Sequence, residues 1–187
     1  MDRLLAALRG SDASIASRAA AEWGAHGVPS TEELIALLAM APAIRSNFTT
    51  AFVVKTRTEE ITWNGYEHVL WALGEAFRQI LKRSRSKRRS VPLFDAVATL
   101  CEDRVYGKGR ESFTMLLGQY GGPRSAPCLV RLLQDPVVDG HALYGLRVLG
   151  ASGGREKAQR LLVAGSGWKR AEARKYLRKL YPDQVAT

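Results

Sequence analysis

The sequence predicts an all-α fold built from stacked helix pairs, and three observations predict it. Apolar residues recur at helical spacing, as Tyr66, Val69, Leu70 and Leu73 do. Prolines fall near the starts of such stretches and glycines near their ends. A short apolar motif closing in Leu-Gly or Trp-Gly also recurs, which is typical of repeat proteins. We therefore expect a right-handed α-α superhelix, a solenoid of about four to five helix pairs, forming a single domain over residues 1–187.

The composition excludes several other classes. The chain has 187 residues, of which 46% are hydrophobic and 25% charged, so it can bury a core without disulfides and is too apolar for wholesale disorder. No apolar run approaches the ~18 residues of a membrane span, and the first residues lack the pattern of a signal peptide. Two cysteines form no disulfide framework. We expect a cytoplasmic protein with no membrane association.

Four repeated units organise the chain. Their first helices are expected to stop near Gly24, Gly74, Gly118 and Gly150, and the last two units align at a spacing of 32 residues. A capping box, Ser30-Thr31-Glu32-Glu33, precedes one of the second helices. The second helices are expected at residues 34–38, 94–100, 128–133 and 158–163.

One segment is ambiguous. Residues 44–61 are expected to be helical like their neighbours, but the run 47–54 is rich in β-branched and aromatic residues, and its propensity alone allows a strand. The following Trp63-Asn64-Gly65 is expected to form a turn.

The repeats resemble the HEAT family, in particular its short HEAT-like repeats of the phycobilisome-lyase type. The best match is Glu111 to Leu162, with Leu117-Gly118, Asp135-Pro136 and Leu149-Gly150. Where that family has Val-Arg after the Asp-Pro, this chain has Asp139-Gly140-His141, which departs from the family's ladder of buried Arg–Asp contacts. The resemblance implies a curved stack of antiparallel helix pairs that acts mostly as a binding scaffold, and it implies no chemistry.

The net charge of +10 is concentrated in two short windows. Residues 78–90 hold seven basic residues and no acidic one, and residues 155–180 hold nine basic and two acidic residues. By contrast, residues 1–77 hold six basic and nine acidic residues. A charge distributed in this way indicates a localised patch for a polyanion.

The first window is an inserted loop at 82–90. Pro92 follows Gly74 by eighteen positions, whereas Pro127 follows Gly118 by nine. Solenoid insertions emerge on one face, which is often the binding face. The loop either contacts phosphates without reading bases, or contacts an anionic protein or membrane surface, or is solvated without a partner. Its candidate nucleic-acid-binding residues are Lys82, Arg83, Arg85, Lys87, Arg88 and Arg89.

The second window lies on the last expected helix. Ala173, Tyr176, Leu177 and Leu180 form its apolar stripe, and basic residues surround the opposite face. This face is either the polar outer side of a terminal repeat or a second contact for a polyanion. The candidate binding residues here are Arg170, Arg174, Lys175 and Arg178.

No residue pattern points to catalysis, to a metal or to a small-molecule cofactor. The three histidines share no metal-ligand spacing with each other or with the cysteines, and the glycine-rich stretches follow no strand. The preferred function is a non-catalytic scaffold that docks nucleic acid, DNA or RNA, or an acidic protein. One alternative is a protein–protein adaptor that uses its concave helix face.

A second alternative is an alkylpurine DNA glycosylase of the HEAT-like kind. Such enzymes use an acidic residue with aromatic neighbours, although the chain shows no stretch that matches their Trp/Asp-bearing motif. The acidic residues that lie beside aromatic ones are Glu59, Glu60, Glu102 and Asp103.

Overall fold

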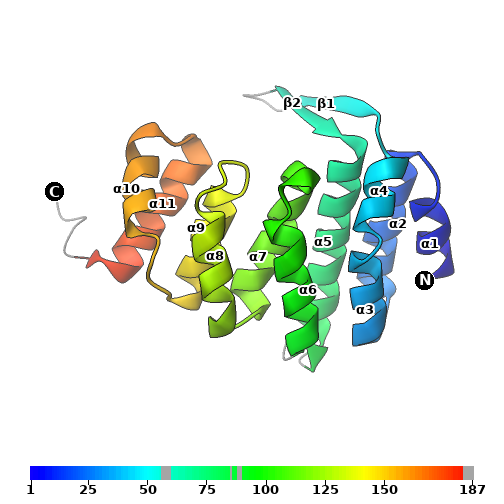
Figure 1. Cartoon of the computed structure of the whole chain (residues 1–187), viewed down its shortest axis with the longest axis horizontal. Coiled ribbons are helices and arrows are strands. Elements are labelled where there is room, and N and C mark those ends of the chain that lie inside the picture. Colours follow the sequence, from blue (N-terminus) through cyan, green and yellow to red (C-terminus); the bar gives the residue numbers. More distant parts are fainter. Residues whose placement is uncertain (56–59, 85, 88–89, 183–187) are drawn as a thin grey trace. The chain divides into compact units, whose positions relative to one another are not determined.

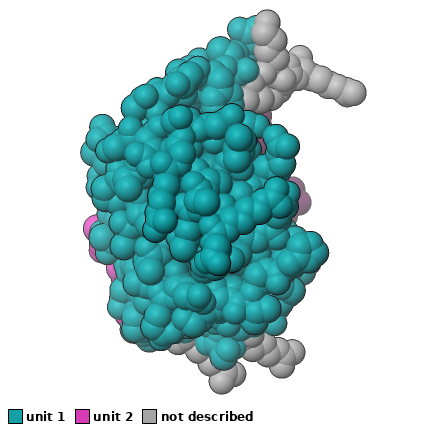
Figure 2. Space-filling model, turned by 90° about the vertical axis from the view of Figure 1, so that its right-hand side faces the viewer, with its two compact units in different colours: residues 1–113 teal, residues 114–187 magenta. Residues whose placement is uncertain are grey.

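The computed structural model of the chain describes residues 1–55, 60–84, 86–87 and 90–182. It divides into two compact units, unit 1 with residues 1–113 and unit 2 with residues 114–187. The elements are labelled in Figure 1 and the units are coloured separately in Figure 2. The mostly helical structure confirms the all-α class, while the superhelix and the single repeat domain stay predictions.

Unit 1 contains six helices, a hairpin and a 3-10 helix within its described residues. In chain order these are α1 (Asp2–Leu8), α2 (Ala13–His26), α3 (Thr31–Leu38), α4 (Ala41–Asn47), β1 (Ala51–Lys55), β2 (Glu60–Asn64), α5 (Gly65–Arg83), α6 (Val91–Glu102) and η2 (Arg104–Arg110). The helix α2 packs against α5, and α3 packs against α6. The core includes Phe77 and Phe113, whose ring centroids lie 5.6 Å apart.

Unit 2 is helical wherever it forms regular structure among its described residues. The helix α7 (Glu111–Tyr120) contains the boundary between the units, and η3 (Pro123–Ser125), α8 (Ala126–Leu132), α9 (Asp139–Leu149), α10 (Arg155–Ala164) and α11 (Gly167–Leu180) follow it. The helix α11 packs against both α9 and α10. Leu143 and Tyr176 are fully buried in this core.

Most of the expected helices are present. The segments 34–38, 94–100 and 158–163 lie inside α3, α6 and α10, and α8 covers all but the last residue of 128–133. The capping box is confirmed because Glu33 N donates to Ser30 Oγ at 3.1 Å and Ser30 N donates to Glu33 Oε2 at 2.6 Å. Local helix signals therefore predicted these elements well.

The expected helix over 44–61 is wrong beyond Asn47. In its place β1 pairs antiparallel with β2, so that Phe52 stands opposite Trp63, and Figure 1 shows the hairpin beyond the ends of the helices. The β-branched and aromatic run follows its own propensity, since these side chains pack well across paired strands. Asn64 and Gly65 do not form a free turn either, because Asn64 caps α5 and Gly65 begins it.

Gly74 does not end a helix, contrary to expectation, because α5 continues to Arg83. A Cβ at Gly74 would lie 2.0 Å from Ser112 Oγ, so this glycine permits a close approach inside the unit. Gly24 does the same for α2 and α5, since its Cβ would lie 2.6 Å from the Ala76 Cα. The other three expected stops match the structure. The helices α2 and α7 end two residues after Gly24 and Gly118, and Gly150 caps α9 with a φ of 70°.

The buried carboxylate of Glu67 joins the hairpin to the helices. Its Oε2 accepts from Asn64 N at 2.9 Å and its Oε1 accepts from Lys108 N at 2.8 Å, which links β2, α5 and η2.

None of the described helices combines the length and the apolar character that crossing a membrane requires.

Candidate nucleic-acid interface

The first basic window begins on a helix. Lys82 and Arg83 form the last turn of α5, and both are exposed. Arg83 Nη2 donates to Gly24 O at 2.7 Å and to Gly27 O at 3.2 Å, at the carboxyl end of α2. A cation is favoured at this end of a helix, where carbonyl groups lack partners. Arg83 is therefore held in place while it keeps its positive charge at the surface.

The rest of this window is a short connection to α6. Lys87 Nζ lies 3.5 Å from Ser84 Oγ. Hydrogen bonds to the backbone and to Ser30 lower the pKa of Glu32, and the positive charge of Lys87 adds a smaller effect in the same direction. Lys87 is thus near the start of α3 as well as the end of α5. Arg85, Arg88 and Arg89 lie outside the described residues.

The second window covers α10 and α11, and its candidate binding residues lie on α11, as expected. The acidic and basic residues of α11 lie on different faces of the helix. Glu172, the only acidic residue of the helix, is buried and accepts a hydrogen bond from Arg147 of α9. Arg174, Lys175 and Arg178 are exposed on the opposite face. Arg170 is also exposed, and its Nη2 donates to Gly165 O at 3.2 Å.

Other charges of unit 2 are neutralised inside it. The buried Asp139 carboxylate pairs with Lys157 Nζ at 2.7 Å and with Lys169 Nζ at 2.5 Å. The sequence departs at Asp139 from the buried Arg–Asp contacts of the HEAT family. In the structure this aspartate lies between Lys157 and Lys169. The pairing holds α9, α10 and α11 together, so that Lys157 and Lys169 serve the fold and α11 keeps a purely cationic outer face.

The structure also reveals an aromatic cluster where the hairpin meets α5. His68 stands 5.1 Å from Phe52, 6.1 Å from Trp63 and 6.4 Å from Trp71 between ring centroids. Its Nδ1 shares a hydrogen bond of 2.8 Å with Ser17 Oγ of α2. Burial lowers the pKa of His68, which favours the neutral ring. All four rings of the cluster are partly exposed.

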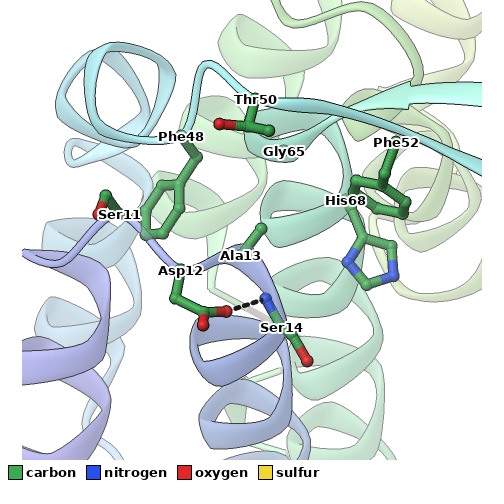
Figure 3. Close-up of a pocket in the computed structure, with 9 residues that line it drawn as sticks. All are labelled: Ser11, Asp12, Ala13, Ser14, Phe48, Thr50, Phe52, Gly65 and His68. Atoms are coloured by element: carbon green, nitrogen blue, oxygen red, sulfur yellow. Dashed lines mark hydrogen bonds between the residues drawn. The ribbon is translucent and has the colours of Figure 1, made fainter.

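Two hollows flank His68. The hairpin cleft, of about 630 Å³, lies between α2 and the hairpin, and Figure 3 shows its hydroxyls and rings. Its lining includes Ser11, Asp12, Ser14, Phe48, Phe52 and His68. The helix groove, also of about 630 Å³, follows the seam between α2 and α5. Its lining includes Arg18, Ala21, His68, Trp71, Ala76 and Arg83.

This site was not predicted from the sequence because Ser17 and His68 are 51 residues apart, and no local pattern brings α2 to α5. Two signals were nevertheless present. Phe52 falls in the run that also favours a strand, and His68 and Trp71 are three residues apart on one helix face. Together they would have placed aromatic rings beside a hairpin.

The acidic residues considered for a glycosylase are spread over different elements. Glu60 begins β2, and Glu59 lies outside the described residues. Glu102 ends α6, and the Asp103 carboxylate accepts from Val105 N at 3.2 Å as the cap of η2. Asp103 and Tyr106 line a cleft of about 400 Å³ beside α3 and α6.

Comparison with family models, curated proteins and solved structures finds no match to the chain.

Proposed function

We propose that the protein is a non-catalytic HEAT-like binding scaffold that docks nucleic acid through its two basic windows. The outer face of α11 carries this proposal. Arg174, Lys175 and Arg178 are exposed there, while Glu172 is buried against Arg147 on the inner side. The one carboxylate of α11 is therefore neutralised on the inner side of the helix, and its outer face keeps the positive charge.

The charge pattern favours a polyanion over the simple capping of a repeat stack. A terminal repeat needs a polar outer face, which charges of mixed sign supply equally well. A face with cations alone is expected to attract phosphates and to release their condensed counterions. Flexible cationic side chains on phosphates carry no sequence information, so we expect binding that tolerates many sequences of DNA or RNA.

The first window supports the same function from unit 1. Lys82, Arg83 and Lys87 are cationic residues around the end of α5. Arg85, Arg88 and Arg89 join the proposed interface on the strength of the sequence alone. Because Arg83 is anchored on the carbonyls of α2, its contribution needs less ordering of the side chain than that of a solvated arginine.

The experiment compares two triple variants of the full chain by fluorescence anisotropy with a labelled duplex at low salt. The first is Arg174→Gln, Lys175→Gln and Arg178→Gln, and glutamine keeps the helix propensity of α11. The control is Arg3→Gln, Arg9→Gln and Arg45→Gln, which removes the same charge from exposed positions in unit 1. We expect the first to weaken binding by about tenfold or more and the control by about twofold or less. Equal losses in both, or no binding by the unmodified protein, would refute the proposal.

A further inference from the structure

The hairpin cleft and the helix groove meet at one side chain. His68 lines both hollows, so they follow one face of α5 from the hairpin to the end of the helix. Arg83 lines the far end of the helix groove and belongs to the first basic window. The rise of an α-helix puts His68 and Arg83 about 22 Å apart along α5. A groove of this length suits a linear chain that has rings at one end and cations at the other.

Aromatic rings form the hairpin end of this path. Phe52 lines the hairpin cleft, Trp71 lines the helix groove, and His68 lies between them. The planes of His68 and Trp71 are within 16° of parallel, and Trp63 packs edge-on against both. Trp63 is itself braced by Lys108, whose Nζ lies 5.6 Å from its ring centroid. The rings are therefore held by the fold and do not need to be ordered by a ligand.

Charge along the helix groove is positive on balance, whereas the hairpin cleft carries the Asp12 carboxylate. Glu75 is matched by Arg78, whose Nε donates to it at 2.9 Å, and this pair leaves no net charge. Arg18 on α2 is exposed at the groove, and Arg83 keeps its charge at the far end. Alanines of both helices, among them Ala21 and Ala76, also line the groove. Cationic side chains bind phosphate groups and aromatic side chains stack on flat rings, so the groove can recognise a ligand that carries both.

We propose that this path binds single-stranded nucleic acid, with bases stacked on Phe52, His68 and Trp71 and phosphates near Arg18 and Arg83. The proposal rests on the proposed function and names the class of nucleic acid for unit 1. In a duplex the base faces are already stacked, whereas an unpaired strand can splay its bases onto aromatic side chains. Stacking is sequence-tolerant because every base has a π-face, in keeping with the phosphate contacts proposed for α11.

The competing occupant is an apolar segment of a protein partner, which the alanines that line the groove would also suit. The rings distinguish the two. An apolar segment would retain its contact with a leucine of similar volume, whereas a base needs the aromatic face. Substitution of the rings by leucine therefore separates the two occupants while it preserves much of the apolar packing.

The test measures binding of the full chain to a labelled single-stranded oligonucleotide and to a duplex of the same length. The variants are Trp71→Leu and Phe52→Leu, with Trp168→Leu as a control that removes an exposed ring from unit 2. We expect Trp71→Leu and Phe52→Leu each to lose about fivefold or more in single-strand affinity, while their duplex affinity stays within about twofold of that of the unmodified protein. Arg18→Gln, at an exposed position that does not threaten the fold, should also weaken single-strand binding.

Each contrary outcome has a distinct meaning. Unchanged single-strand affinity in Trp71→Leu, Phe52→Leu and Arg18→Gln, with binding by the unmodified protein intact, overturns the groove proposal and leaves nucleic-acid docking standing. Equal losses for single strand and duplex in folded variants also overturn it. Absence of binding to either nucleic acid overturns the proposed function itself.

Discussion

Glu172 and Arg147 form an ion pair on the inner side of α11, with side-chain exposures of 8% and 24%. The carboxylate stands four residues before Tyr176, on the buried stripe of the helix. Because the single acid of α11 is used to hold α9, the exposed cations of the helix have no acidic neighbour on their own element. The same contact therefore contributes to the fold of unit 2 and to the charge of its surface.

Glu172→Gln should destabilise the protein by about 1–3 kcal/mol, because it leaves the Arg147 guanidinium partly buried without its anion. The urea unfolding midpoint measures the change. Glu156→Gln is the matched control, since Glu156 is 84% exposed in its pair with Arg160. We expect the control to stay within about 0.5 kcal/mol. Equal effects of the two substitutions would contradict a structural role for the inner pair.

Gly24→Ala should destabilise unit 1, although alanine is the better helix former. Its Cβ would lie 2.6 Å from the Ala76 Cα, a backbone atom that only a shift of α5 can relieve. Overpacking of this kind costs about 1–3 kcal/mol, which exceeds the ~1 kcal/mol gained in helix propensity. Gly167→Ala provides the comparison, because nothing lies within 4 Å of its Cβ in α11. Thermal unfolding of the two variants should show a lower midpoint for Gly24→Ala and no loss for Gly167→Ala.

Stability should fall as the pH drops from 7 to 5, and His141 should account for part of the fall. Burial and, to a smaller extent, the positive charge of Lys169 lower the pKa of His141 from 6.5 to about 4, although the charge of Asp139 opposes both. Between these two values the unfolded chain takes up a proton that the folded protein does not, so stability is lost as the pH falls. The expected loss from His141 is about 2 kcal/mol at pH 5.

His141→Asn isolates this contribution. His68, whose pKa is also lowered by burial, acts in the same direction in both proteins and so cancels in the comparison. Urea unfolding at the two pH values should show a smaller loss for the variant than for the unmodified protein. The same loss in both would mean that His141 does not remain neutral in the folded protein.

The helices were predictable because their signals are local. The capping box at Ser30 and the apolar spacing along α5 need only neighbouring residues to be recognised. The hairpin was also predictable, from the β-branched run around Val53. A helix was expected there because the neighbouring segments are helical, although the propensity of the segment itself favours a strand. The predicted helix end at Gly74 was wrong for a different reason. A glycine where two elements pack closely cannot be distinguished in the sequence from a glycine that ends a helix.

The candidate site could be predicted only in part. The cationic side of α11 follows from the spacing of its apolar stripe, and the burial of Glu172 follows from its place on that stripe. The anchoring of Arg83 on Gly24 and the bond of Ser17 to His68 depend on the packing of α2 against α5, which helical periodicity does not specify. Tertiary contact, and not composition, turns these residues into a groove.

The dependence of duplex affinity on salt tests the central claim most directly. Each phosphate contact contributes about −0.9 to the slope of log affinity against log salt for duplex DNA. For the variant Arg174→Gln, Lys175→Gln and Arg178→Gln, we predict a slope shallower by about 2–3 than that of the unmodified protein. The control Arg3→Gln, Arg9→Gln and Arg45→Gln should keep the original slope. An unchanged slope in the α11 variant would contradict the assignment of its outer face to nucleic acid.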